Sequence, residues 1–362
     1  MKKLLFTCVI VMGINTSLLG QMRPFKPSVP FESYEAAKSF LESQEAEGQF
    51  SGAVLVERYG KELTKEAYGM ADVEYQTPMK TDTKINLGSI NKAFTAVSVM
   101  QLVDAQKIKL TDKIVDYIPE LQMDMADEIT VMNLLEMKSG LGSYWDSERF
   151  LAAYATLKDM EDYVPIIAEY QLNSKPGTQR AYSNSSYELL GVLVQRVIGQ
   201  NYYDYVRENV YHKAGMKDTD AFERDMEVPN RAHGYSKYKN GEPMGPGTDE
   251  KKNKPFIYNV NDRSPVKGTA AGGGYSTLDD LRKFVKALTS NQLLSKASTD
   301  MVINHFREAK TRNAVYAVRG GSYGINSTVF FDTDTQHLVI VMCNYDPPTA
   351  SEIMRRLRIT GV

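Results

Sequence analysis

Ser89 and Lys92 combine a nucleophile with a base three residues apart, in the stretch NLGSINKAFTAVSVMQL. On a helix, side chains three residues apart share a face and can hydrogen-bond. The following residues, from Ala93 to Val103, are apolar nearly all round, which predicts a helix running through the core. Burial disfavours the ammonium form, so a neutral lysine can accept the serine proton, while the helix N-terminus favours an oxyanion.

The Ser-x-x-Lys spacing alone is not specific. It recurs at Ser236 with Lys239, in a polar stretch, and at Ser264 with Lys267, around a proline. Only the first occurrence begins an apolar helical pattern, so its context favours it. The alternative for Lys92 is a lysine that extends from a helix end into solvent while its stem packs.

A second candidate group is the tripeptide Tyr-Ser-Asn at 182–184, directly before a helical pattern. Ser185 with Glu188 predicts a capping box at the start of that helix, and Gly199 marks its end. Tyr182 and Asn184, two apart in an extended turn, point the same way and can reach one cleft. The alternative for Tyr182 is a half-buried aromatic side chain that holds the loop.

The elements that must position these residues are strands at both ends of the chain. Apolar, β-branched runs predict strands at Ala53–Glu57, Leu63–Tyr68, Ser327–Phe331 and His337–Met342, followed by a helix over 350–357. Helical periodicity in the middle predicts Ser89–Ala105, Met160–Tyr170, Ser186–Ile198, Tyr202–Val210 and Leu278–Leu288. We therefore expect an α/β (α+β) fold, with a central, mainly antiparallel sheet formed by both termini, flanked by helices, and an inserted, mainly helical lobe.

Composition excludes several classes of function. The chain has 362 residues, 42% hydrophobic and 24% charged, which is typical of a globular protein with a large core. A net charge of -2 with interspersed acids and bases gives no basic surface for nucleic acid or anionic lipid. A neutral or weakly charged partner fits better.

The first 20 residues have the layout of a secretory signal peptide: two lysines, an apolar run from Leu4 to Met12, then small and polar residues. The apolar run is too short to span a bilayer, so no membrane insertion is expected. The alternative is a buried N-terminal helix. Cleavage would remove Cys8 and leave only Cys343, so we expect a secreted or periplasmic chain of residues 21–362 without an internal disulfide.

Six stretches occur together, spread between about Ser51 and Asn344: SINK, KLTDKIVDYIPEL, ITVMNLLEMKSGL, KPGTQRAYSNSSYELLG with its YSN, AGMKDT and AAGGGYSTLDDLRKF. The chain thereby resembles the serine β-lactamase and penicillin-binding protein superfamily, in the branch of class C β-lactamases, D-alanyl-D-alanine carboxypeptidases and related esterases. The resemblance implies sheet parts at about 50–88 and 265–362, a helical lobe at about 89–264, and an active site between them.

By the same resemblance, Ser89 is the nucleophile, Lys92 its base partner and Tyr182 the proton shuttle to the leaving group. Asn184 contacts a substrate amide or the lysine. No metal or organic cofactor is expected.

One element departs from that family. Where it has Lys-Thr-Gly or His-x-Gly, this chain has Val318, Arg319 and Gly320, and the preceding segment looks shortened. The oxyanion hole needs only backbone N–H groups, which Ser89 and Gly321 can supply. If Arg319 faces the cleft, its guanidinium positions an anionic substrate group.

Other motifs carry less chemistry. The histidines have no metal-ligand spacing and are interpreted as ordinary core or surface residues: His212, His233, His305 and His337. Lys267-Gly268-Thr269 is in the wrong order for the missing element and is interpreted as a loop. Trp145 either lines a substrate cleft or packs.

The sequence therefore predicts a secreted serine hydrolase that forms a Ser89 acyl-enzyme on an ester, amide or peptide, including cell-wall-derived substrates. The alternative is a catalytically impaired peptidoglycan- or peptide-binding protein on the same scaffold.

Overall fold

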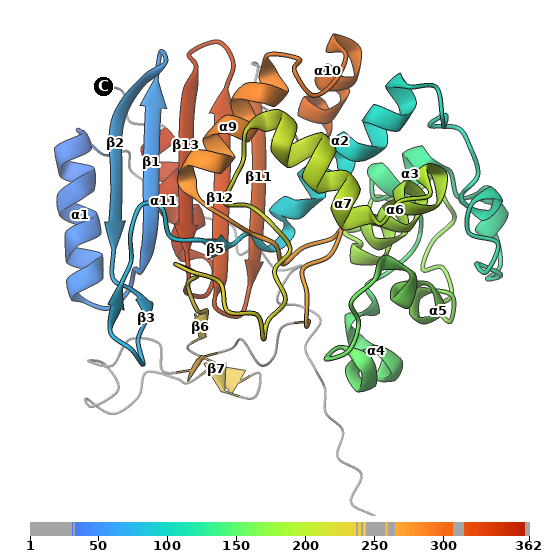
Figure 1. Cartoon of the computed structure of the whole chain (residues 1–362), viewed down its shortest axis with the longest axis horizontal. Helices are drawn as coiled ribbons and strands as arrows, with labels where there is room; N and C mark the ends of the chain where they lie inside the picture. The colour runs from blue at the N-terminus through green and yellow to red at the C-terminus, as the bar shows by residue number, and fades with distance from the viewer. Residues whose placement is uncertain are drawn as a thin grey trace, which may run out of the picture.

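A five-stranded antiparallel sheet joins the two ends of the chain in the computed structural model (Figure 1). The structure describes residues 31, 33–236, 238–239, 242–243, 258–259, 265–306 and 315–358. The strand order is β11-β12-β13-β1-β2. The strands are β1 (Gly52–Arg58), β2 (Lys61–Tyr68), β11 (Val315–Ser322), β12 (Ile325–Asp332) and β13 (His337–Cys343). The pairing of β1 with β13 confirms the predicted sheet built from both ends.

Each face of the sheet is covered because β1 and β13 are apolar on both sides. Ala53 and Leu55 of β1 belong to the core shared with the helical lobe, whereas Val54 and Val56 belong to a second core. In Figure 1, α9 (Leu278–Thr289) crosses one face and α11 (Thr349–Arg358) lies behind the other; α1 (Tyr34–Ala46) packs on the second core beside β2.

The helical lobe lies beside the β11 edge of the sheet, and α2 (Asn91–Asp104) runs between the two (Figure 1). Its other helices are α3 (Val131–Leu135), α4 (Glu148–Ala153), α5 (Val164–Ile167), α6 (Asn184–Ile198) and α7 (Tyr202–Val206), with α10 (Lys296–His305) above. Single turns at Gly88–Ile90 (η2), Tyr144–Asp146 (η5) and Met160–Tyr163 (η6) join them. Further turns are Ile114–Asp116 (η3), Ala126–Glu128 (η4) and the π-helical Arg207–His212 (η7).

Among the described residues, four short strand pairs lie outside the five-stranded sheet. They are β3 (Met70–Asp72) with β4 (Thr77–Pro78), β5 (Ile85–Asn86) with β10 (Tyr275–Ser276), β6 (Tyr235–Ser236) with β9 (Tyr258–Asn259), and β7 (Tyr238–Lys239) with β8 (Glu242–Pro243). Within the described ranges, no helix is both long and apolar enough to cross a membrane.

Several predicted boundaries need correction. The expected helix Met160–Tyr170 is a 3₁₀ turn followed by α5, which restarts around Pro165, a residue that lacks a backbone N–H. Strand β11 pairs with β12 over eight residues, and residues 307–314, which precede it, lie outside the described residues. Gly199 ends α6 in the left-handed conformation, as predicted.

Two predictions concern residues that the structure does not describe. The signal peptide at 1–20, with Cys8, lies outside the described residues, as does most of the polar stretch 236–255. Cys343 is buried and forms no disulfide within the described residues.

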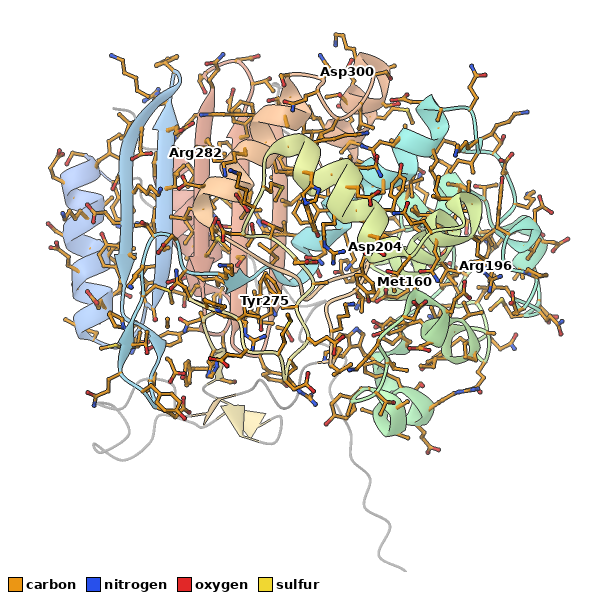
Figure 2. All side chains as sticks on the ribbon, viewed as in Figure 1. Met160, Arg196, Asp204, Tyr275, Arg282 and Asp300 are labelled. Atoms are coloured by element: carbon orange, nitrogen blue, oxygen red, sulfur yellow. The ribbon has the colours of Figure 1, made fainter. Side chains whose placement is uncertain are left out.

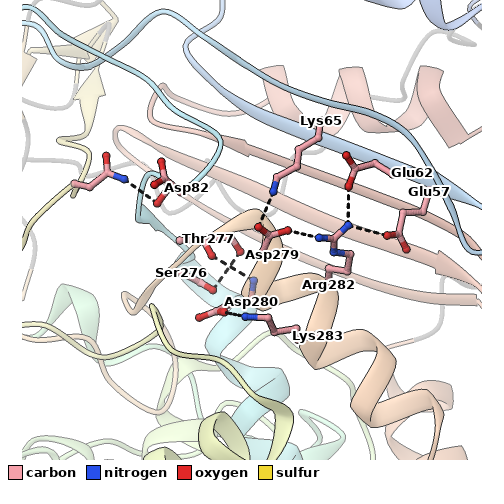
Figure 3. A network of polar contacts seen from close by, with 11 residues as sticks. Glu57, Glu62, Lys65, Asp82, Ser276, Thr277, Asp279, Asp280, Arg282 and Lys283 are labelled. Atoms are coloured by element: carbon pink, nitrogen blue, oxygen red, sulfur yellow. Dashed lines mark hydrogen bonds and ion pairs between the residues drawn. The ribbon is translucent and has the colours of Figure 1, made fainter.

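Helix α9 docks on the sheet through a charged network centred on Arg282 (Figure 3). Its guanidinium contacts Glu57 at 3.0 Å, Glu62 at 2.7 Å and Asp279 on its own helix. Lys65 of β2 also reaches Asp279, at 2.6 Å. Glu57 is the critical partner because its side chain is only 5% exposed.

We expect Arg282→Gln to lower the free energy of unfolding by about 1–3 kcal/mol, because it leaves the buried Glu57 with one fewer charge partner. The control is Lys296→Gln in the exposed pair with Asp300 on α10 (Figure 2), which should change stability by less than about 0.5 kcal/mol. Urea unfolding of both variants measures the difference. Equal effects would mean that the α9 network adds nothing beyond an ordinary surface pair.

Candidate active site

Ser89 stands in the 3₁₀ turn η2, which leads directly into α2. The preceding Gly88 has φ +51°, in the left-handed region that favours glycine. The turn lies against the edge strand β11 so closely that a Cβ atom on Gly320 would come within 1.8 Å of Leu87 O and 2.8 Å of Ser89 N. Glycine at position 320 therefore allows the β11 backbone to lie beside the serine.

Two other side chains meet at the Ser89 hydroxyl. Its Oγ lies 2.5 Å from Tyr182 Oη and 3.2 Å from Lys92 Nζ. Lys92 is 2% exposed, whereas Tyr182 is 45% exposed. The serine proton thus has a buried amine on one side and a phenol that reaches solvent on the other.

Lys92 Nζ has three acceptors within hydrogen-bonding distance. Besides Ser89 Oγ, it donates to Asn184 Oδ1 at 2.8 Å and to the Ala271 carbonyl at 2.5 Å. An ammonium group has three N–H donors for these acceptors. A neutral amine keeps the bonds to Asn184 and Ala271 and turns its lone pair to the serine. The geometry accommodates both protonation states that a base must adopt.

The start of α6 differs from the sequence prediction. The N-cap is Ser183, in extended conformation with φ -141°, and its side chain accepts from Ser186 N. The predicted box of Ser185 with Glu188 is wrong because the helix begins two residues earlier and both side chains are buried. This cap still directs the residue on either side of it, Tyr182 and Asn184, to the Ser89 and Lys92 side chains.

The β11 residues divide between two faces of the sheet. Val318 is 5% exposed and belongs to the core shared with α2, so Arg319 next to it faces the opposite side. On that side, a Cβ on Gly321 would meet Pro347 at 2.9 Å. The structure thus brings the backbone of the two glycines to Ser89 but directs the Arg319 side chain away, against the expectation that it faces the cleft.

Comparison with known proteins shows the family of the chain. The sequence matches the family model described as Beta-lactamase over residues 37–361. The chain belongs to the beta-lactamase family. That membership places it among the serine hydrolases at a general level.

Curated relatives of this beta-lactamase-family chain are distant. It is 28% identical over 208 residues to Protein flp of Staphylococcus aureus (strain MW2), covering 56% of this chain and 41% of the relative. It is 25% identical over 272 residues to Penicillin-binding protein 4* of Bacillus subtilis (strain 168), covering 72% and 56%. The chain spans about half the length of the curated relatives it matches.

Solved structures share the fold. The penicillin binding protein from Bacillus halodurans superposes with a TM-score of 0.75 at 23% identity, covering 88% of this chain and 97% of that one. The D-amino acid amidase from Ochrobactrum anthropi SV3 superposes with a TM-score of 0.74 at 21% identity, covering 89% and 97%. These likenesses confirm the predicted mixed fold with an antiparallel sheet.

The other Ser-x-x-Lys occurrences have different surroundings in this beta-lactamase-family chain. Ser236 is buried, and its Oγ donates to Asp346 Oδ2 at 3.0 Å. Ser264 lies outside the described residues. Lys267 Nζ lies 3.9 Å from the centre of the Tyr203 ring.

Two of the four histidines, His305 and His337, are partly or fully buried. Burial lowers the pKa of His305 and His337 to about 4, and His305 Nε2 lies 3.0 Å from Tyr187 Oη. His233 lies close to Asp72 and Glu74: one possible metal-ligand atom of each residue lies within 4.8 Å of the other two. The spacing of the three residues along the sequence did not indicate this group. His233 Nδ1 lies 3.3 Å from Asp72 Oδ2.

Trp145 packs on its aromatic neighbours, which is one of the two interpretations left open by the sequence. Its ring stacks on Tyr144 with centroids 6.0 Å apart and packs on Phe150, yet 37% of the residue is exposed. Ser143, two residues earlier, contacts Asn184 Nδ2 at 3.4 Å. The indole is therefore a packed, partly exposed side chain in a segment that contacts Asn184 through Ser143.

Sequence analysis missed the role of Glu188. This residue is 0% exposed, and its Oε1 accepts from Tyr144 Oη at 2.6 Å and from Thr269 Oγ1 at 2.7 Å. Burial raises the pKa of the Glu188 carboxyl to about 7, against the lowering effect of these two hydrogen bonds, of Lys92 and of a hydrogen bond from the Ala271 backbone. The only signal was a Ser-x-x-Glu pattern, which indicated a helix cap instead.

The raised pKa of Glu188 predicts a pH-dependent stability. A carboxyl whose pKa is higher in the folded state stabilises that state below the unfolded pKa, and the contribution is lost as pH rises through the folded value, from about 4.5 to about 7. Between pH 4 and pH 8 the wild type should lose roughly 3 kcal/mol of unfolding free energy through Glu188. The Glu188→Gln variant cannot ionise there, so its unfolding free energy should rise by that amount relative to the wild type. Urea unfolding at both pH values measures this gain; a constant difference would contradict the raised pKa.

Proposed function

We propose that this chain is a serine hydrolase that transfers the acyl group of an ester, amide or peptide first to Ser89 and then to water. The observation that carries the proposal is the contact of one hydroxyl, Ser89 Oγ, with both Lys92 Nζ and Tyr182 Oη at the start of α2. A serine nucleophile needs a proton acceptor and an oxyanion site, and both surround this atom.

In the proposed reaction, Ser89 Oγ attacks the carbonyl carbon while its proton passes to Lys92, directly or through Tyr182. The backbone N–H groups of Ser89 and Gly321 stabilise the oxyanion. When the tetrahedral intermediate collapses, the bond to the leaving group breaks and the leaving group takes a proton through Tyr182. Water then attacks the acyl-enzyme and gives its proton to the Lys92 and Tyr182 path. The acid is released, and Ser89 takes the proton back as the free serine.

The substrate class is proposed from similar proteins. They include a penicillin binding protein, a D-amino acid amidase, and EstCE1, a hydrolase with promiscuous acyltransferase activity. We propose a small-molecule or peptide substrate, with cell-wall-derived peptides among the candidates. Parallel assays with a p-nitrophenyl ester, a D-amino acid amide and a penicillin test this, with Ser89→Ala as the control. Ester turnover that Ser89→Ala retains in full would overturn the serine mechanism.

Val318 favours one alternative function. Its buried apolar side chain occupies the position where the resemblance implies a lysine or histidine. A chain that binds peptidoglycan fragments without turnover, with a Kd that Ser89→Ala leaves unchanged, would be a binding protein on this scaffold.

We further propose that the protein is secreted or periplasmic, because its first 20 residues have the layout of a signal peptide. Expression in a bacterial host with the natural N-terminus should give an exported chain beginning near Gln21. N-terminal sequencing of the exported protein measures this. A folded product that keeps Met1 would contradict it.

A further inference from the structure

The segment 269–271 lies along α2 and supplies it with acceptors. Three successive carbonyls each accept from a side chain of α2: Thr269 O from Asn91 Nδ2 at 3.1 Å, Ala270 O from Thr95 Oγ1 at 2.7 Å, and Ala271 O from Lys92 Nζ at 2.5 Å. The last of these bonds holds the Lys92 amine together with its bond to Asn184 Oδ1. The place of Lys92 therefore depends on where this segment is held.

On its other side the segment is held by α6. Glu188 lies one helical turn after Asn184, so the two side chains share a face of that helix. Thr269 Oγ1 donates to Glu188 Oε1 at 2.7 Å and accepts from Ala271 N at 3.2 Å. Thr269 N also donates to Gly272 O at 2.6 Å, which closes the turn. A chain of hydrogen bonds thus runs from Glu188 to Ala271, whose carbonyl holds Lys92.

A carboxyl at this position is costly. Glu188 is fully buried, and removing a carboxyl from water is unfavourable unless its bonds compensate. An apolar side chain of similar volume would pack without that cost, but it would leave the Thr269 hydroxyl with only the longer contact to Gly272 O, at 3.4 Å. The cost is explained if the acceptor itself is needed to orient the turn.

We propose that Glu188 is a positioning residue: through Thr269 it fixes the 269–272 turn so that the Ala271 carbonyl holds the Lys92 amine against Ser89. This inference rests on the proposed function of Ser89 and Lys92. Glu188 touches no reacting atom. Its effect reaches the site through the backbone of the turn.

The test compares rates of Ser89 acylation by a fluorophosphonate probe. Thr269→Val keeps the shape but breaks the link, and should slow acylation by about 10²-fold, the cost of a small misplacement of a reacting group. Thr269→Ser keeps the hydroxyl and should restore most of that loss. Glu188→Ala should slow acylation like Thr269→Val, whereas Glu188→Gln, which still offers an oxygen acceptor, should recover most of the rate.

Tyr144→Phe is the matched control. It removes the other buried partner of Glu188 and so costs stability, but it leaves the path from Glu188 through Thr269 intact. It should acylate at close to the wild-type rate. If Tyr144→Phe loses as much as Thr269→Val, or if Thr269→Val acylates normally, Glu188 is only a structural residue.

A crystal structure of Thr269→Val separates failure of this inference from failure of the proposed function, because it needs no activity. We expect Ala271 O to lie beyond hydrogen-bonding distance of Lys92 Nζ. An unchanged bond would overturn the positioning role even if Ser89 is the nucleophile. A displaced bond, with a wild-type chain that no probe labels, would support the positioning of Lys92 and refute the hydrolase proposal.

Discussion

Replacing Lys92 with methionine is expected to slow acylation of Ser89 by about 10³–10⁴-fold. Methionine fills the buried volume but cannot accept the proton that the serine must lose. It also leaves the Asn184 Oδ1 and Ala271 O atoms without the donor they have now. The loss should appear in the acylation rate with a fluorophosphonate probe, and in kcat/KM with a small ester.

Because Lys92 is buried, the folding of the Lys92→Met variant must be checked separately from its activity. Circular dichroism and the thermal midpoint establish that the variant is folded. Lys107→Met, at an exposed lysine just after α2, should leave acylation unchanged. A folded Lys92→Met variant that acylates as fast as the wild type would show that the amine is not the base.

Tyr182→Phe is expected to reduce turnover by ~10²–10⁴-fold, since the phenol is proposed to carry a proton between Ser89 and the leaving group. The ring is 45% exposed, so the loss of one hydroxyl should cost little stability, unlike a change at Lys92. The effect should be larger for amides than for p-nitrophenyl esters, because an amine leaving group must be protonated. Steady-state kinetics on a matched ester and amide measure the ratio.

The two substitutions should combine non-additively because both side chains serve one proton path. The double variant Lys92→Met with Tyr182→Phe should be only slightly slower than Lys92→Met alone. Fully multiplicative losses would show that the two residues act independently. An equal loss of turnover on ester and amide would show that Tyr182 does not protonate the leaving group.

The sheet could be predicted where strands are apolar on both faces. The runs that form β1 and β13 indicate buried strands by composition alone. Strand β11 was not predicted because it contains Arg319, Gly320 and Gly321, which are not typical of a strand. Glycine at 320 is required by the close approach of Leu87 O, a contact between segments more than 200 residues apart that no local pattern records.

The candidate site also has residues that could be predicted from the sequence and residues that could not. Ser89 with Lys92, and Tyr182 with Asn184, could be predicted because each pair belongs to one local element whose geometry fixes its direction. Glu188 belongs to the same helix as Asn184, yet its partners are Tyr144 and Thr269, which only the fold brings near. The Ala271 carbonyl could not be found either, since a backbone acceptor leaves no mark on the sequence.

The most direct measurement of the central proposal is intact-mass analysis after exposure to a fluorophosphonate or penicillin probe, followed by peptide mapping. We expect a single added label, on Ser89, with Ser236 and Ser264 unlabelled despite the same spacing to a lysine. Ser89→Ala should abolish the label. A label on another serine, or an equal label on Ser89→Ala, would contradict Ser89 as the nucleophile. A folded chain that no probe labels and that turns over no ester would contradict the hydrolase proposal and favour the binding-protein alternative.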